Sequence, residues 1–221
     1  MLNQVLKMSD FVSKWTKPSG GGFGERVREA VRPLGPLRPR LEAAIRQIQI
    51  QISKLDATSL KLKERDAAIF NKVVSAIQKH DMQHATVFAN ELAEIRKMNK
   101  MVTAAKLALE QIVLRLNTVQ ELGDIVVTLA PAMGVIRSIR SGLVSVLPEA
   151  ESEISEISNL LGSILIDAGQ LGAATINFEA ANEDAERILA EASAVAEQKM
   201  REKFPDLPTS VRASDTLEGI S

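Results

Sequence analysis

Apolar residues recur at seven-residue intervals along two long stretches of the chain, a spacing typical of helices that pack along a narrow seam. The first stretch runs from Arg40 to Lys79, and polar residues interrupt its apolar lines only at Ser59 and Asp66. At 1.5 Å per residue it predicts a helix about 60 Å long. Its two apolar lines are Leu41, Ile48, Leu55, Leu62, Ile69 and Ala76, and Ile45, Ile52 and Val73.

The second stretch runs from His84 to about Leu122. Between the two stretches the pattern loses phase at Lys79-His80-Asp81-Met82, where we expect the chain to turn. Two long helices joined by a short turn form an antiparallel hairpin, here over about residues 40–121. The apolar lines of the second helix are Phe88, Ile95, Val102, Leu109 and Leu116, and Leu92, Met98, Ala105, Ile112 and Val119.

Shorter helices are predicted over about residues 125–203, and they complete a helical core of residues 40–203. The fold class is therefore all-α: a long antiparallel helical hairpin followed by shorter helices. Glycines and Pro131 favour short helices that can bend at the start of this region. The next two helices are amphipathic and acidic, and the last ends before Pro205. Their expected apolar residues are Ile154, Ile157, Leu161, Ile164, Ala168 and Leu171, and Phe178, Ala181, Ala185, Ile188, Ala192 and Val195.

Residues 1–17 predict a separate amphipathic helix, with bulky apolar side chains on one face and lysines on the other. Residues 18–39, which contain SGGGFG and RPLGPLRP, follow as a tether. Their glycines lack the preceding strand and the following Lys-Ser or Lys-Thr of a phosphate-binding loop. The arrangement predicts a helix that enters the membrane interface, whereas docking on the rest of the fold is the alternative. The predicted membrane-binding residues here are Leu2, Val5, Leu6, Lys7, Met8, Phe11, Val12, Lys14 and Trp15.

The apolar residues of this 221-residue chain are almost all aliphatic. Hydrophobic residues make up 45% of it, with one Trp, no Tyr and six Phe, which suits long helices better than a compact globule. Because the chain has no cysteine, disulfides and thiolate metal sites are excluded.

The net charge of −1 conceals opposite charges on the two halves of the chain. Residues 1–140 carry 22 Lys and Arg against 13 Asp and Glu, and residues 141–221 carry 5 against 15. A basic half can meet an anionic surface, and an acidic half can compete for it, so we expect residues 149–203 to fold back on the hairpin. Six cations within about 60° on the first long helix, here called the basic stripe, are predicted to face lipid. They are Arg40, Lys54, Lys61, Arg65, Lys72 and Lys79.

No group of residues favours catalysis, a metal site or a cofactor. His80 and His84 have the spacing of a zinc pair, but no third histidine accompanies them and they lie at the predicted turn. Since no nucleophile with its base and no nucleotide loop is present, we expect no enzyme. The basic residues lack interleaved aromatics, so no nucleic-acid partner is expected, although duplex binding through phosphates stays open.

Residues 204–221 form a polar tail that begins with FPDLP. The prolines favour an extended segment that presents Phe204 and Leu207 to a groove. A simple end to the preceding helix is the alternative.

Two stretches are more particular than a generic coiled coil: ATVFANELAEIRKM at residues 85–98 and LAPAMGVIRSIRSGLVSVLPEAESEISEISNLL at residues 129–161. With these stretches in this order, the chain resembles the ESCRT-III family of membrane-remodelling filament proteins, and among them the archaeal CdvB-type cell division proteins. The resemblance covers nearly the whole chain. The sequence ends without the C-terminal winged helix of one CdvB subtype, which favours a shorter paralog.

The resemblance implies a protein that polymerises with itself and with paralogous ESCRT-III subunits on anionic membrane lipid. It implies a peripheral location in the cytoplasm, at the inner face of the cell membrane and at the division site. FPDLP resembles the proline-containing motif that recruits a AAA ATPase through its MIT domain, with Phe204, Pro205, Leu207 and Pro208 as the matching residues. The tail lacks the further prolines of a full motif.

Two other classes of protein share parts of this pattern. A soluble coiled-coil adaptor without membrane activity would have the same heptads but no need for residues 1–17. A duplex DNA-binding protein would use the same basic stripe and would show steep salt dependence on DNA.

Overall fold

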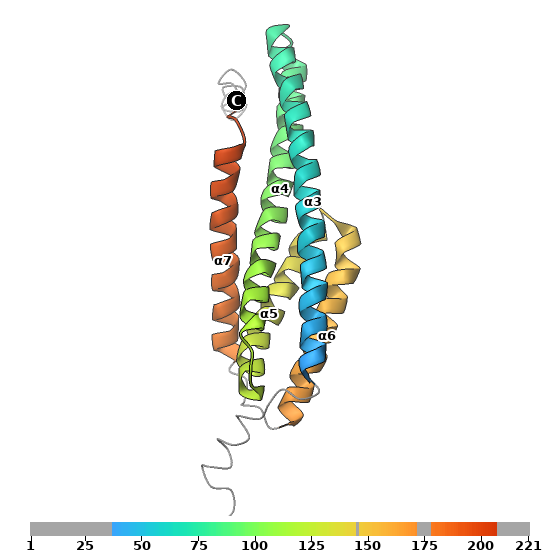
Figure 1. Cartoon of the computed structure of the whole chain (residues 1–221). Coiled ribbons are helices and arrows are strands. Elements are labelled where there is room, and N and C mark those ends of the chain that lie inside the picture. Colours follow the sequence, from blue (N-terminus) through green and yellow to red (C-terminus); the bar gives the residue numbers. More distant parts are fainter. Residues whose placement is uncertain (1–36, 145, 172–177, 207–221) are drawn as a thin grey trace, which may run out of the picture.

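The computed structural model describes residues 37–144, 146–171 and 178–206 (Figure 1). In these ranges the chain is all-helical, so the predicted fold class is confirmed. The predicted N-terminal helix of residues 1–17 and nearly all of the tether lie outside them. The five helices of this part are α3 (Leu37–Gln78), α4 (Met82–Asn117), α5 (Leu122–Leu143), α6 (Pro148–Gln170) and α7 (Phe178–Lys203).

Helices α3 and α4 form the predicted antiparallel hairpin and give the molecule its length (Figure 1). The chain turns at residues 79–81, as the loss of phase predicted. His80 takes a left-handed conformation with φ of 56°, and its N–H donates to the carbonyl of Ile77. Asp81 caps α4, because its side chain accepts a hydrogen bond of 3.1 Å from the backbone N–H of His84.

Proline sets two details of the fold that differ from expectation. Helix α3 begins at Leu37, three residues before the predicted start at Arg40, and it contains Pro39 in its first turn. Proline is tolerated there because the first N–H groups of a helix have no partner within it. Pro131 lies inside α5, which is one helix of 22 residues rather than several short ones. The missing N–H of Pro131 removes one hydrogen bond from its interior.

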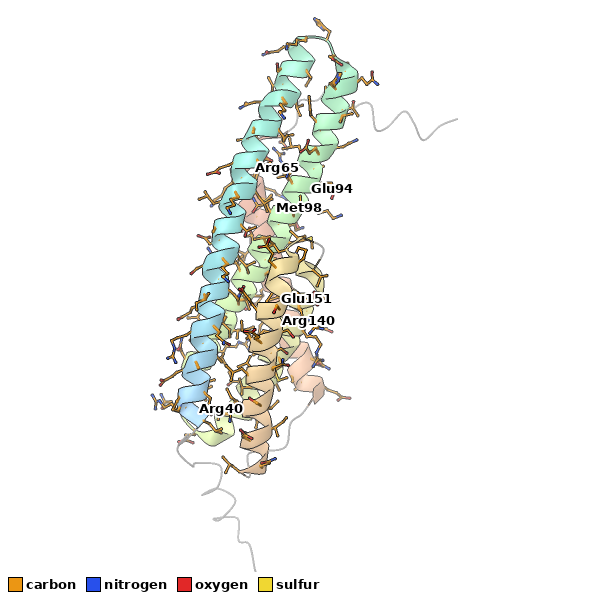
Figure 2. The ribbon with its side chains drawn as sticks, turned by 90° about the vertical axis from the view of Figure 1, so that its right-hand side faces the viewer. Arg40, Arg65, Glu94, Met98, Arg140 and Glu151 are labelled. Atoms are coloured by element: carbon orange, nitrogen blue, oxygen red, sulfur yellow. The ribbon has the colours of Figure 1, made fainter. Side chains whose placement is uncertain are left out.

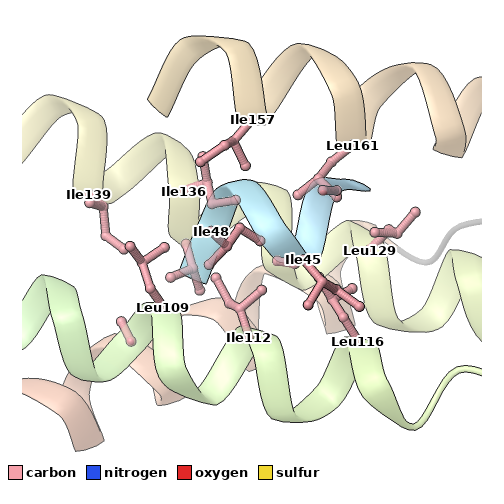
Figure 3. Packing of buried hydrophobic residues seen from close by; sticks show 14 of the residues in the cluster. Ile45, Ile48, Leu109, Ile112, Leu116, Leu129, Ile136, Ile139, Ile157 and Leu161 are labelled. Atoms are coloured by element: carbon pink, nitrogen blue, oxygen red, sulfur yellow. The ribbon is translucent and has the colours of Figure 1, made fainter. Parts of the chain in front are cut away.

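A large apolar core forms where α5, α6 and α7 pack on the base of the hairpin. Helix α6 lies against α3, and α7 lies against α4 (Figure 1). Figure 3 shows side chains from α3, α4, α5 and α6 pointing toward one another in this core. Those labelled there are Ile45, Ile48, Leu109, Ile112, Leu116, Leu129, Ile136, Ile139, Ile157 and Leu161.

Helix α5 supplies apolar residues to this core from a stretch that also has the length and composition of a membrane span. Asp124–Leu143 is the one stretch in the described ranges with this property, and 44% of it is buried inside the fold. Ile125, Leu129 and Ile136 are fully buried there, so packing within the chain accounts for its apolar character.

The distal part of the hairpin has a separate, smaller core. Its buried members come from α3 and α4 alone: Ile69, Val73, Ala76, Ala85, Ala89, Leu92 and Ile95. This part projects beyond α5 and α6 toward the turn (Figure 1). It is a two-helix rod supported by its own seam.

Polar residues occupy the two breaks in the heptad pattern between the two cores. Ser59 is buried and donates a hydrogen bond of 2.7 Å to the Oδ1 atom of Asn99. Asn99 fills the fully buried seam position on α4, and the predicted Met98 beside it is partly buried against the distal core. A buried polar pair fixes the register of two helices, because any shift leaves both groups without partners.

Asp66 forms the second polar contact. It is 2% exposed, and the Nε atom of Arg96 donates to its carboxylate at 2.7 Å. The Arg96 side chain is 20% exposed, so most of this ion pair lies out of water. Removal of one partner from such a pair is costly, because the remaining charge stays buried.

We predict that Arg96→Ala lowers the free energy of unfolding by about 3 kcal/mol, because it leaves the Asp66 carboxylate buried without its cation. The double variant Asp66→Leu with Arg96→Met should recover most of this loss, since no buried charge remains. Urea unfolding of the three proteins measures the difference. Equal destabilisation by the single and double variants would contradict this assignment.

Candidate functional site

The basic stripe extends along α3 from the base of the hairpin to its tip. Figure 2 shows Arg40 near the base of α3 and Arg65 nearer the tip. The two halves of the stripe have different surroundings, because α6 covers α3 at the base and the distal hairpin projects beyond it. The stripe is therefore only in part an open cationic surface.

Two carboxylates of α6 meet the lower half of the stripe. Arg40 pairs with Asp167 and also donates a hydrogen bond of 2.7 Å to the hydroxyl of Ser163. Lys54 pairs with Glu153, which also accepts a hydrogen bond from the buried side chain of Gln51. The expected return of the acidic region to the basic hairpin is thus present between α6 and α3.

The pKa of Glu153 lies below its ordinary value of 4.5. The hydrogen bond from Lys54 is the largest cause and the hydrogen bond from Gln51 the next, and both favour the ionised carboxylate. Ionised Glu153 therefore favours the docked position of α6. Its side chain is 38% exposed, so solvent screens the pair.

The upper half of the stripe makes contacts within the hairpin. Arg65 forms an ion pair of 2.7 Å with Glu91, and the ammonium of Lys72 lies 5.6 Å from the ring centroid of Phe88. Lys61 and Lys79 are exposed and form no ion pair with any residue in the described ranges. Lys79 lies at the tip of the distal rod, whereas Lys61 lies near the start of α6 and lines a depression with Leu147 and Glu149.

Helix α7 brings a second set of acids to the other long helix. Glu197 forms an ion pair of 3.0 Å with Lys100, and Asp184 lies 4.0 Å from Arg115. The pKa of Glu197 is lowered, first by its hydrogen bond to Lys100 and then by that to Arg201. Acidic residues from the C-terminal half of the chain thus pair with cations on both long helices of the hairpin.

The end of α7 places the first residue of FPDLP against the hairpin. Phe204 is half-buried, and the guanidinium of Arg96 lies 5.5 Å from its ring centroid. Pro205 is exposed, whereas Leu207 and Pro208 lie outside the described residues. The proposed role of this motif stays a prediction.

The two histidines lie at the hairpin tip. His84 Nδ1 is 2.7 Å from Asp81, the residue that caps α4. Within residues 37–144, 146–171 and 178–206, no group of three or more His, Asp or Glu side chains is arranged to hold a metal ion. Of the two histidines, His84 contacts the capping residue at the start of α4.

The nine predicted membrane-binding residues in the N-terminal segment, from Leu2 to Trp15, lie outside the described residues. Their role stays a prediction.

Two curated proteins of Sulfolobus acidocaldarius are similar to the chain over most of its length. Cell division protein B1 is 43% identical over 173 residues, which cover 78% of this chain and 81% of that protein. Cell division protein B is 35% identical over 172 residues, which cover 76% of this chain and 66% of that protein. The chain belongs to the CdvB family of archaeal, ESCRT-III-like proteins.

No protein-family model matches the chain, and no solved structure matches it significantly. Membership of the CdvB family, whose members are structural division proteins, supports the prediction that the chain is not an enzyme.

Several polar contacts of this CdvB-family chain were not predicted from the sequence. Gln51, Arg96 and Asn99 are polar or charged residues that lie at or beside the seam. Val195 was predicted to be buried in α7 but is 41% exposed, and Ala196 takes the buried position. The apolar period identifies a helix face, but small differences in helix rotation decide which of two adjacent residues is buried.

We predict that Glu153→Gln lowers the free energy of unfolding at neutral pH by about 0.5 kcal/mol, as expected for a partly exposed ion pair. Because the folded-state pKa is lowered, the contribution is complete above about pH 4.5 and is lost as the pH falls through the folded value. The difference between the two proteins should therefore shrink in acid. Urea unfolding over a pH series measures it.

Glu151→Gln is the matched control, since Glu151 is exposed on the same helix and forms no ion pair with a described residue. A pH-independent difference for Glu153→Gln, or an equal effect of both variants, would contradict the role given to Glu153.

Proposed function

We propose that this CdvB-family chain polymerises into filaments on anionic membrane and remodels or constricts that membrane during archaeal cell division. The filaments contain copies of this chain and related ESCRT-III subunits, at the inner face of the cell membrane. The names of the two relatives, cell division proteins B1 and B, support a role in cell division. The observation that carries the mechanism is the placement of acidic α6 on the basic stripe of α3.

The hairpin suits the role of a rigid filament subunit. Its two helices pack along their full length, and its distal part has its own core. Leu60 on α3 and Val87 on α4 are apolar residues that are 58% and 59% exposed. A side-by-side contact between copies that covered these two side chains would gain from their removal from water.

The membrane contact combines the basic stripe with residues 1–17. Each Lys or Arg near an anionic surface contributes about 1 kcal/mol, so a few accessible cations give one subunit only weak affinity. A filament presents many copies at once and converts this weak affinity into strong binding. The apolar face from Leu2 to Trp15 would insert beside the lipid headgroups, and the tether would let it do so independently of the hairpin.

The same acidic helices provide control of assembly. We call the arrangement with α6 and α7 packed on the hairpin the closed subunit. In it, Asp167 and Glu153 neutralise Arg40 and Lys54. Lipid phosphates would compete with these carboxylates for the same cations, so a membrane on the stripe would shift the chain toward a form with α6 released. Release of α7 would need a second competition, for Lys100 and Arg115 of α4, which Glu197 and Asp184 contact.

Release of α7 would also expose the tail motif. Phe204 contacts Arg96 in the closed subunit, and the MIT domain of a AAA ATPase would bind Phe204, Pro205, Leu207 and Pro208 in an extended form. The ATPase would then drive filament disassembly, since the chain itself has no expected nucleotide site.

A soluble coiled-coil adaptor is the second candidate function. The pairing of Arg40 and Lys54 within the chain favours it, because these two cations are already neutralised without a membrane. Such a protein would remain a small oligomer when lipid is present.

Sedimentation with anionic liposomes tests the proposed function. We expect the full chain to pellet as filaments that coat the lipid, and we expect depletion from the pellet when the chain begins at Gly20, because the apolar face of residues 1–17 is then absent. Electron microscopy of the pellets checks for filaments. If both proteins stay in the supernatant as small oligomers, the adaptor function replaces the proposed one.

Gly134 allows a second test, of the closed form. A Cβ atom at Gly134 of α5 would lie 3.0 Å from the Cβ atom of Ala185 in α7, whereas a Cβ atom at Gly142 would have no neighbour within 4 Å. Gly134→Ala should weaken α7 docking by about 1 kcal/mol and raise the undocked population about fivefold. We therefore expect more filament at a given lipid concentration.

Gly142→Ala is the matched control, because it makes the same change in the same helix without the contact to α7. Equal assembly by the two variants would contradict the proposed competition between α7 docking and filament formation.

A further inference from the structure

Four lysines from three helices surround a depression between the hairpin and α7. Lys63 comes from α3, Lys106 from α4, and Lys199 and Lys203 from α7. The depression has a volume of about 90 Å³, and Thr103 and Asp56 also line it. Lys199 and Lys203 are four residues apart, so both project from the same side of α7.

The charges around this depression are unbalanced. Asp56 is the one carboxylate among its lining residues, and it pairs with Lys106. Lys106 also lies 3.8 Å from Glu110. Lys63, Lys199 and Lys203 form no ion pair with any residue in the part of the chain that the structure describes. Four ammonium groups therefore share one lining carboxylate at a helix junction.

The environment of Lys63 reflects this imbalance. Burial is the largest cause that lowers its pKa, and the positive charge of Lys203 is the next. Asp56 acts in the opposite direction, and Lys106 and Lys199 add to the repulsion. A multivalent anion in the depression would offset both the repulsion and the lost hydration.

We propose that Lys63, Lys106, Lys199 and Lys203 form a binding site for a phosphate-bearing anion that joins α7 to the hairpin. Lysine ammonium groups bind phosphate as point charges, and several of them can share the oxygens of one phosphoryl group. The hydroxyl of Thr103, in the same lining, can add a neutral donor. A single carboxylate would supply only one negative charge.

The site exists only in the closed subunit. Two of its lysines belong to the hairpin and two to α7, so release of α7 separates them. An anion that binds only the docked arrangement stabilises that arrangement. The bound anion would therefore keep α7 and Phe204 against the hairpin.

The position of Lys63 separates this site from the basic stripe. Lys63 is two residues from both Lys61 and Arg65, which places it about 160° around α3 from each. A membrane that lies on the stripe would not reach the depression at the same time. This geometry favours a free phosphate compound over a lipid headgroup as the source of the anion.

Calorimetry and thermal unfolding of the full chain with pyrophosphate test the proposal, with sodium chloride at equal ionic strength as the reference. We expect saturable binding and a raised Tm. The double variant Lys63→Gln with Lys203→Gln should weaken the affinity at least tenfold, since each charge-assisted hydrogen bond is worth about tenfold or more. Lys97→Gln with Arg140→Gln is the matched control, because it removes two exposed cations away from the depression.

Further variants separate loss of binding from loss of folding. Lys63→Arg with Lys203→Arg keeps both charges and should retain binding. In buffer without phosphate, the double glutamine variant should be at least as stable as the parent chain, because like-charge repulsion is removed. Equal pyrophosphate binding by the parent, glutamine and control proteins would overturn the proposal. If pyrophosphate does not bind at all, the vesicle experiment below decides.

Vesicles identify the source of the phosphate. Phosphatidic acid carries a terminal phosphoryl group, whereas phosphatidylglycerol does not. If the parent chain binds pyrophosphate and the glutamine variant does not, the ligand is a free anion. If the parent chain does not bind pyrophosphate but prefers phosphatidic acid vesicles, and the same variant loses this preference, the ligand is a lipid headgroup. Absence of both effects would overturn the site.

Discussion

Helices α3 and α4 pack along an apolar seam that extends from the base of the hairpin to its turn, and α5, α6 and α7 rest on this pair. The seam is long and narrow because its residues are aliphatic and recur every seven positions. Two polar contacts, Ser59 with Asn99 and Asp66 with Arg96, lie within it. These contacts reduce apolar burial in the seam, but they specify one register of the two helices. A single register keeps the surface residues of both helices aligned.

The opposite charges of the two halves of the chain act on this scaffold. The hairpin carries cations on more than one side, α6 brings acids to α3, and α7 brings acids to α4. Most of these ion pairs are partly exposed, and such pairs contribute little individually. The docked state also buries Ile157, Leu161 and Ile188 in the main core, so an anionic surface that releases α6 or α7 must compensate for this apolar burial as well as for the ion pairs. The distal hairpin, with its own core, can keep its shape while the acidic helices move.

Much of the fold was predictable from the sequence. The heptads predicted the hairpin and its turn, and the amphipathic spacing predicted α6 with its buried Ile154 and Leu161. The single helix α5 was not predicted, because Pro131 is normally a helix breaker and only packing in the core compensates for its missing hydrogen bond. Asn99 was not predicted because a polar residue on an apolar face is recognised only when its partner across the seam is known.

The candidate site was less predictable than the fold. A helical wheel placed the basic stripe on one side of the first long helix, but it could not show which cations α6 neutralises, since that depends on the contact between two segments about a hundred residues apart. The four lysines around the depression come from three helices and share no local motif. Such sites arise from tertiary packing and leave no period in the sequence.

Hydrogen exchange of the full chain, free and bound to anionic vesicles as filament, tests most directly whether the membrane and the acidic helices compete for the hairpin. The account predicts that amides in α6 and α7 lose protection on the vesicles, whereas amides in the distal hairpin keep theirs. Unchanged protection of α6 and α7 in membrane-bound filaments would contradict it.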